Sequence, residues 1–191
     1  METIFNALIN SFINDKVGIA EHFLNESLSG HLKENLTALF AKNKMQPAGT
    51  GNHVINHDKL VRGDSIHWLD RVHNDEHEDS FFDLMDHFVK YLNECCYTGI
   101  KSYEFHYTLY TPGTFYKKHM DRFQNNDSRK FSMIMYLNTE WIPEDGGELC
   151  IHHETGLQNI SPQNGKVVFF KSNELEHEVL MKHKDRMSIT E

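Results

Sequence analysis

Histidine and aspartate two residues apart recur in this chain, and the surrounding sequence favours one such pair, His119 and Asp121, as a metal site. In a β-strand, residues two apart point to the same face, so these side chains would present an imidazole and a carboxylate to one point. A second histidine from elsewhere would complete two nitrogens and one oxygen on one face of a metal ion. That donor set, with the opposite face open, is typical of non-haem Fe(II) centres.

The spacing alone is weak evidence, because the chain has 14 histidines among 191 residues. The same pattern occurs at His73/Asp75, His77/Asp79 and His183/Asp185. Residues 73–79 form a polar run without a strand pattern, which favours a solvated loop, and residues 183–185 resemble a turn before the last strand. Only His119/Asp121 follows a turn signal, at residues 111–114, and precedes a long apolar stretch. We therefore predict the metal site there.

We expect the third metal ligand to be His177, in the late segment KVVFFKSNELEHEVL. Alternation within this segment places His177 on one face with Leu175 and Val179, while the flanking glutamates point outward. A histidine between two glutamates can also be an ordinary surface residue. The prediction therefore requires that this segment pass beside the strand that carries His119.

Arg186 opens the alternating segment RMSIT, in which Ser188 and Thr190 share its face. An arginine that points into a barrel is costly to bury unless it meets an anion. Its guanidinium fork matches a carboxylate, and either hydroxyl can add a donor. We predict an anion site at Arg186; the alternative is an ion pair with an internal acidic residue.

Apolar residues at helical spacing predict three helices in the first half of the chain. The first covers residues 4–13, and the second covers residues 25–40. Ser80 is the predicted N-cap of the third helix, which ends before Gly99.

Strand patterns dominate after Gly99, although residues 17–23 and parts of 53–72 also suit strands. The segment SYEFHYTLY alternates, whereas several later ones are apolar on both parities. The later strands are predicted at FSMIMYLN (131–138), ELCIHH (148–153), KVVFF (166–170) and RMSIT (186–190).

This order of elements predicts an α+β fold whose core is a double-stranded β-helix, a cupin-like jelly roll. The strands that are apolar on both faces need a cover, so we expect the N-terminal helices to pack on the outside of one sheet. We expect a single domain over residues 1–191, with N-terminal helices in 1–45 and the jelly-roll core from about residue 100 to 191.

Composition narrows the classes of partner. The net charge is −9 without a basic run, which argues against nucleic acid. No apolar run approaches the ~20 residues of a membrane span, and the N-terminus lacks the features of a signal peptide. The three cysteines include no Cys-x-x-Cys pair, which favours a reduced, cytoplasmic compartment.

The motifs around these residues resemble those of the Fe(II)/2-oxoglutarate-dependent oxygenases. More narrowly, they resemble the prolyl 4-hydroxylases of the oxygen-sensing prolyl-hydroxylase-domain type and their bacterial relatives. The resemblance covers about residues 45–191 and rests on VRGDSIHWLD (61–70), YTPGTFYKKHMD (110–121), MYLN (135–138), GGEL (146–149) and FFKSNELEHEV (169–179). It implies a dioxygenase that uses Fe(II), 2-oxoglutarate and O2, with ascorbate as a reductant. The implied reaction is 4-hydroxylation of a prolyl residue in a protein or peptide substrate.

The resemblance also assigns roles to individual residues. It makes His119, Asp121 and His177 the iron ligands at the catalytic centre. It pairs Arg186 and Tyr136 with the distal carboxylate of 2-oxoglutarate and puts Tyr110 near the end of the cosubstrate that lies closest to the metal. On the substrate side it assigns Arg62, Asp64 and Trp68, with Arg129 paired to the aspartate.

Two alternatives stay open. The same oxygenase chemistry could act on a small molecule or a free amino acid, because the loop at 71–79 is more acidic and histidine-rich than the family pattern. Alternatively, the chain could be a non-catalytic jelly roll that binds a metal or another ligand.

Overall fold

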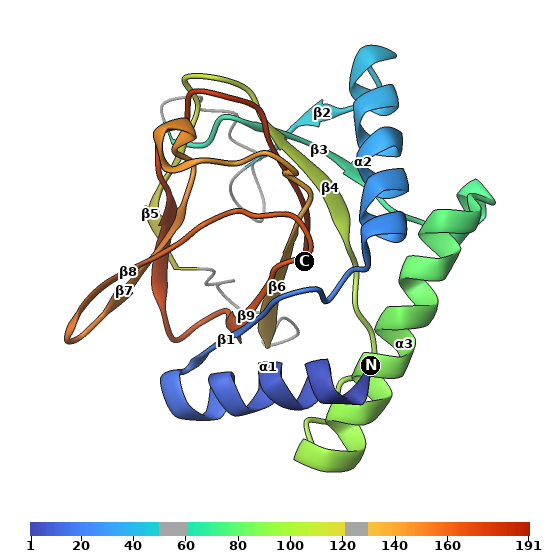
Figure 1. Cartoon of the computed structure of the whole chain (residues 1–191), viewed down its shortest axis with the longest axis vertical. Coiled ribbons are helices and arrows are strands. Elements are labelled where there is room, and N and C mark those ends of the chain that lie inside the picture. Colours follow the sequence, from blue (N-terminus) through green and yellow to red (C-terminus); the bar gives the residue numbers. More distant parts are fainter. Residues whose placement is uncertain (50–60, 121–129) are drawn as a thin grey trace.

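The structure is a computed structural model, and it describes residues 1–49, 61–120 and 130–191. Two antiparallel sheets face one another as a jelly roll, and helices cover the outer side of the larger sheet (Figure 1). The predicted fold class is therefore confirmed. Among the described residues, no helix has both the length and the apolar character needed to cross a membrane.

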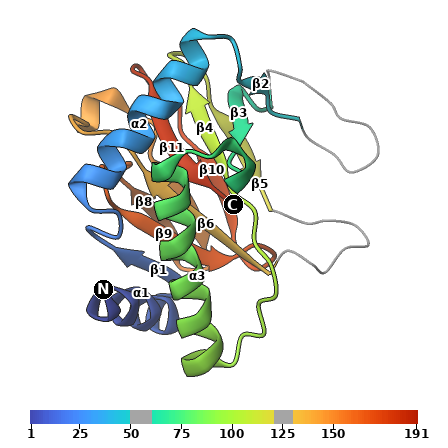
Figure 2. The ribbon, with the colours of Figure 1, turned by 90° about the vertical axis from the view of Figure 1, so that its right-hand side faces the viewer.

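Three helices cover the major sheet: α1 (Glu2–Asp15), α2 (Glu26–Ala41) and α3 (Glu76–Cys96). In Figure 2, α2 and α3 lie in front of the strands and α1 lies below β1. The apolar side chains of all three helices share one core cluster with the sheet. The start of α2 agrees with the sequence prediction. The Asn25 side chain caps this helix by accepting a hydrogen bond from the Leu28 amide at 2.8 Å.

The major sheet has a continuous order of strands. Its members, in spatial order, are β1 (Val17–Ala20), β9 (Val167–Lys171), β6 (Phe131–Tyr136), β11 (Arg186–Thr190), β4 (His106–Tyr110), β3 (Asp64–Trp68) and β2 (Gln46–Pro47). All five residues of β4 are buried, although SYEFHYTLY predicts alternating exposure. One face of β4 meets the helices and the other faces the interior of the jelly roll, so both parities lose contact with water.

The minor sheet carries part of the candidate site on its inner face. Its spatial order is β5 (Tyr116–His119), β10 (Glu176–Val179), β7 (Leu149–His153) and β8 (Gly156–Ile160). Leu149 and Ile151 point inward and pack with Ile134 and Phe170 of the major sheet in a second core cluster. Two short 3₁₀ helices, η1 (Arg71–His73) and η2 (Pro143–Asp145), connect elements.

The predicted N-cap at Ser80 is wrong, because α3 begins one turn earlier. The Asp75 side chain caps the helix by accepting hydrogen bonds from the amides of His77 and Glu78 at 3.0 and 2.9 Å. Residues 73–79 are therefore not a solvated loop: they include the end of η1 and the first turn of α3, where Glu78 is only 3% exposed. Acidic residues are favourable in a first helical turn because they face the positive end of the helix dipole.

Candidate active site

Two predicted metal ligands lie side by side on the inner face of the minor sheet. Strands β5 and β10 pair antiparallel, and His119 and His177 are partners in that register. Their ring centroids are 4.3 Å apart with the ring planes 58° from one another. The two imidazoles can therefore reach a common ion.

Backbone hydrogen bonds leave the same nitrogen available on both rings. The Nδ1 atom of His119 lies 2.7 Å from the Lys117 carbonyl, and that of His177 lies 3.2 Å from the Leu175 carbonyl. A carbonyl only accepts, so each Nδ1 carries the proton and donates. In the neutral ring Nε2 then keeps its lone pair, which is the tautomer that a metal ligand needs.

Aromatic neighbours hold both rings in place. Tyr116 stacks on His119 with centroids 3.6 Å apart, and Phe170 meets His177 edge-on at 4.9 Å. His177 is only 5% exposed. The predicted third ligand, Asp121, and the predicted substrate residue Arg129 lie outside the described residues.

Arg186 is a buried cation with an unused donor. It is 3% exposed, and its Nε donates to the Gly147 carbonyl at 2.8 Å. Among the described residues, its Nη2 has no hydrogen-bond partner, and neither has the hydroxyl of Tyr136. Buried donors left in this state are costly, so the arrangement favours binding of an acceptor such as a carboxylate.

Two tyrosines flank the Arg186 guanidinium. Its Cζ lies 5.2 Å from the ring centre of Tyr110 and 5.0 Å from that of Tyr136. Burial raises the pKa of Tyr136, although the charge of Arg186 opposes the shift. Burial likewise raises the pKa of Tyr110, with a further increase from Asp64. Both phenols therefore stay neutral at physiological pH and can donate hydrogen bonds.

A glycine allows the loop before β7 to approach Arg186. Gly147 has φ +79°, and a Cβ there would lie 3.2 Å from Cδ of Arg186 and 3.1 Å from Cβ of Lys182. Lys182 is 1% exposed, and its Nζ donates to the Lys184 carbonyl at 2.7 Å. Burial lowers the pKa of Lys182 to about 7; Asp185 opposes this shift, and the charge of Arg186 adds to it.

One cavity of about 80 Å³ connects the histidines with the arginine, and its wall includes His119, His177, Arg186 and Thr190. Ser188 lies beside Thr190 in the same strand, fully buried, with their side-chain oxygens 3.3 Å apart. The cavity wall also includes His106, Thr108 and Ser132, to which the sequence motifs give no role. The parity of SYEFHYTLY could have indicated two of them, since His106 and Thr108 share a face with Tyr110.

Three of the predicted substrate residues, Arg62, Asp64 and Trp68, belong to the described part of the chain and lie at one side of this cavity. Arg62 lines the cavity and donates two hydrogen bonds to the Asp64 carboxylate, at 2.6 and 2.8 Å. Burial lowers the pKa of Arg62, but the hydrogen bond and charge of Asp64 outweigh it and raise that pKa overall. Trp68 is 47% exposed, and its ring lies 5.0 Å from that of His106.

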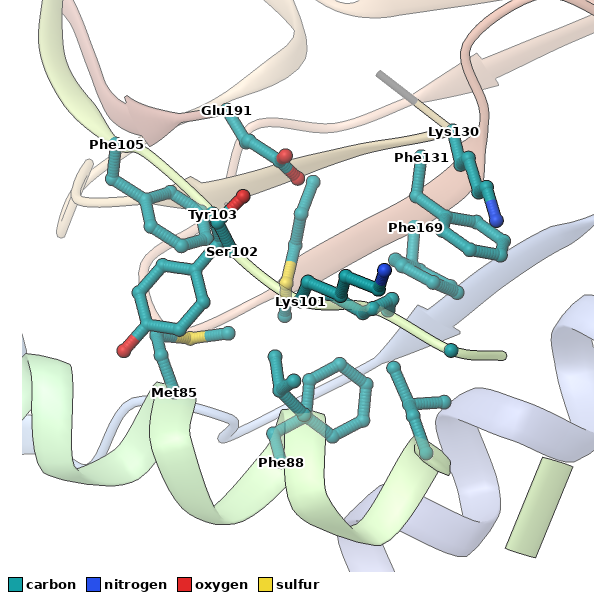
Figure 3. A pocket seen from close by; sticks show the side chains of 15 residues that line it. Met85, Phe88, Lys101, Ser102, Tyr103, Phe105, Lys130, Phe131, Phe169 and Glu191 are labelled. Atoms are coloured by element: carbon teal, nitrogen blue, oxygen red, sulfur yellow. The ribbon is translucent and has the colours of Figure 1, made fainter. Parts of the chain in front are cut away.

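A larger cavity of about 340 Å³ lies between α3 and the major sheet (Figure 3). Its wall is mostly apolar, with Met85, Phe88, Phe105, Phe131 and Phe169, and Lys101 and Lys130 at its edge. Within residues 1–49, 61–120 and 130–191, its wall includes none of those predicted to bind the metal or the anion. The candidate active site is therefore the smaller cavity inside the jelly roll.

Comparison with known proteins places this geometry in a family. The model of the 2OG-Fe(II) oxygenase superfamily matches residues 105–191. A prolyl-4-hydroxylase of Pseudomonas putida has 31% sequence identity, a TM-score of 0.87, and coverage of 97% of this chain and 96% of its own. A Trichoplax adhaerens prolyl hydroxylase has 24% identity, a TM-score of 0.82, and coverage of 99% and 88%.

A viral collagen prolyl hydroxylase of Paramecium Bursaria Chlorella virus-1 shares the fold, with 17% identity, a TM-score of 0.65, and coverage of 93% of this chain and 95% of its own. Three observations support the same family assignment: the paired histidines, the buried arginine and the 31% identity over nearly the whole chain. This chain therefore belongs to the 2OG-Fe(II) oxygenase superfamily, as a prolyl-hydroxylase-like member.

Proposed function

We propose that the chain is an Fe(II)- and 2-oxoglutarate-dependent dioxygenase that hydroxylates the 4-position of a prolyl residue in a protein or peptide. The main support is the cavity in which His119 and His177 face the same interior as the buried donors of Arg186. The 31% identity to a prolyl-4-hydroxylase favours prolyl chemistry over other reactions of the superfamily.

The residues have separate tasks in this proposal. His119, Asp121 and His177 would hold Fe(II), with both histidines binding through Nε2. Arg186 and Tyr136 would bind the distal carboxylate of 2-oxoglutarate, and Tyr110 would lie near its metal-proximal end. Bound Fe(II), with O2 and 2-oxoglutarate, supplies the oxidising chemistry, while the chain supplies orientation and electrostatics.

The hydrogen-bond geometry fits these tasks. A metal needs an unprotonated nitrogen, and the carbonyl partners of both Nδ1 atoms provide one on each ring. A dicarboxylate needs donors in a dry site, and Nη2 of Arg186 and the Tyr136 hydroxyl are buried. Removing one member of such a pair typically costs ~2–5 kcal/mol of binding free energy.

The acceptor would bind beside Arg62, Asp64 and Trp68, with Arg129 paired to the aspartate. The exposed Trp68 ring next to His106 offers an aromatic surface at the edge of the cavity. Such a surface suits an extended peptide with a proline ring. The prolyl hydroxylase of Trichoplax adhaerens was solved with a peptide fragment of a hypoxia inducible factor, which supports a polypeptide acceptor here.

Two further points belong to the proposal. Ascorbate would act as the reductant that restores Fe(II) after unproductive turnover. The protein would work in the cytoplasm, because Cys95, Cys96 and Cys150 are free thiols, as expected in a reducing compartment.

The test is a succinate-release assay with proline-containing proteins and peptides, joined to mass spectrometry of the acceptor. We expect succinate release and a gain of one oxygen on proline, both dependent on Fe(II) and 2-oxoglutarate. Succinate release that occurs with a free amino acid as acceptor, and with none of the polypeptides, would contradict the proposal and indicate a small-molecule substrate. The absence of a metal-to-ligand charge-transfer band with Fe(II) and 2-oxoglutarate under anaerobic conditions would indicate a non-catalytic jelly roll.

A further inference from the structure

A second group of metal-binding side chains lies on the minor sheet, outside the candidate active site. Cys150 and His152 come from β7, and Glu178 comes from the neighbouring strand β10. Their ligand atoms all lie within 4.8 Å of one another. Nε2 of His152 is 2.8 Å from a carboxylate oxygen of Glu178 and 4.0 Å from Sγ of Cys150.

Strand parity puts this group on the opposite face of the sheet from the active site. His177 pairs with Ile151, and both point into the jelly roll. The next pair in the same register is Glu178 with Cys150, which must point outward. The candidate active site and the group of Cys150, His152 and Glu178 therefore lie on opposite faces of the minor sheet, at neighbouring residues of β10.

The donor types match zinc. Thiolate, imidazole and carboxylate are the three protein ligands of Zn²⁺, which prefers four-coordinate tetrahedral sites. The thiolate also selects against hard cations such as Mg²⁺ and Ca²⁺. The side chains of His152 and Glu178 are 22% and 28% exposed, so water can reach the fourth position.

The ligand atoms of Cys150, His152 and Glu178 need to move only slightly to bind one zinc ion. Zinc bonds of ~2.0–2.3 Å in a tetrahedron separate the ligand atoms by roughly 3.3–3.8 Å. The contact between His152 and Glu178 would lengthen, and that between His152 and Cys150 would shorten slightly. Both changes lie within the reach of side-chain rotation, because the backbone partners are already adjacent.

Metal binding at this group would change the protonation of one side chain, the Cys150 thiol. A divalent cation bound to the sulfur would deprotonate it, since a coordinating thiol loses its proton to the metal bond. In that step the S–H bond breaks, a sulfur–metal bond forms, and the proton leaves to solvent without any redox change.

We propose that Cys150, His152 and Glu178 form a second divalent-metal site of the zinc type, separate from the iron site. A metal there joins β7 to β10 across the outer face of the minor sheet. It thereby stabilises the strand that carries His177 without contact with the cosubstrate.

The test uses the full chain, stripped of metal and titrated anaerobically with Co²⁺. We expect a sulfur-to-cobalt charge-transfer band in the near ultraviolet. The predicted iron site contains no sulfur, so this band reports a thiolate ligand alone. The double variant Cys95→Ser/Cys96→Ser is the control and should keep the band, while Cys150→Ser should lose it.

A second variant is needed because Cys150→Ser could lose the band by misfolding. Glu178→Gln keeps the size of the side chain and should weaken Co²⁺ binding at the thiolate site on the order of 10–100-fold or more, since even outer-sphere partners have effects of that size. A band that is absent from the native chain would overturn the proposal. A band that survives Cys150→Ser, or a binding constant unchanged in Glu178→Gln, would do the same. Zn²⁺ should displace Co²⁺ and abolish the band.

Discussion

His177 lies directly across from His119 in the antiparallel pairing of β10 with β5, and the rings are 4.3 Å apart. Each ring is oriented by a hydrogen bond from Nδ1 to the carbonyl two residues earlier in its own strand. The two nitrogens available for a metal therefore come from rigid elements. A site built on strands keeps its geometry better than one built on loops.

We expect His177→Ala to abolish iron binding at the active site, because it removes one of the proposed ligands. The readout is the charge-transfer band that Fe(II) and 2-oxoglutarate give in the absence of oxygen. Glu176→Gln is the matched control, since this neighbour on β10 points outward and its side chain is 47% exposed. An undiminished band in His177→Ala would remove this residue from the metal site.

Truncation of Arg186 should raise the 2-oxoglutarate requirement strongly. The loss of a desolvated charge partner costs about 2–5 kcal/mol of binding free energy. Arg186→Lys should restore only part of it, because an ammonium cannot form the bidentate contact. Calorimetric titration of the iron-loaded protein with 2-oxoglutarate measures the effect. Lys184→Ala, which alters an exposed cation nearby, should bind the cosubstrate normally.

The ion pair of Arg62 and Asp64 should also stabilise the fold. Asp64 has no exposed side-chain surface, so Arg62→Ala leaves a buried carboxylate without this ion-pair partner. We expect a loss of about 3–5 kcal/mol in the free energy of unfolding. The double variant Arg62→Ala/Asp64→Asn should recover part of that loss in urea denaturation. Equal stabilities of the single variant and the native chain would show that Asp64 is hydrated.

The start of α3 can be tested with two substitutions five residues apart. Asp75→Ala removes the cap that accepts two backbone hydrogen bonds and should cost about 1 kcal/mol of unfolding free energy. Ser80→Ala should change stability by less than about 0.5 kcal/mol, because Ser80 is exposed and its hydroxyl donates to the Glu76 carbonyl of the same helix. A larger loss of unfolding free energy in Ser80→Ala than in Asp75→Ala would indicate that the helix begins at Ser80.

Lys182 should make the stability depend on pH. Its folded pKa, about 7, lies below the ordinary value of 10.5. Between these values the unfolded chain binds more protons, so this residue makes the folded state more stable as pH rises. Lys182→Met removes the titrating group, and its stability advantage over the native chain should be largest near pH 6 and shrink by pH 9. Urea denaturation of both proteins at several pH values measures the difference, in which the histidine contributions cancel. A difference that is constant with pH would contradict the lowered pKa.

Local patterns in the sequence were sufficient for the class of fold. Helical spacing located α1 and α2, the strand segments after Gly99 located β6, β7, β9 and β11, and both kinds of pattern depend on neighbours along the chain. Parity within RMSIT also indicated that Arg186 and Thr190 share a face, and both line the cavity.

Cap chemistry was less certain from sequence. Asp75 and Ser80 are both good N-caps; in the structure the helix begins after Asp75, and Glu78 in its first turn bonds to the Asp70 amide and the His73 ring. The alternation of SYEFHYTLY likewise predicted that one face of β4 is exposed to solvent. Neither face is exposed, because the helix side packs in the core with α3 and the other side lines the cavity.

The pairing of distant strands belongs to the tertiary structure alone. Nothing local in the sequence places His119 beside His177, or Glu178 beside Cys150, because these pairs depend on which strands become neighbours and in which register. A shift of one residue would turn every side chain of β10 to the other face. The residue types were determined by sequence, whereas the packing of the two sheets decided which of them meet.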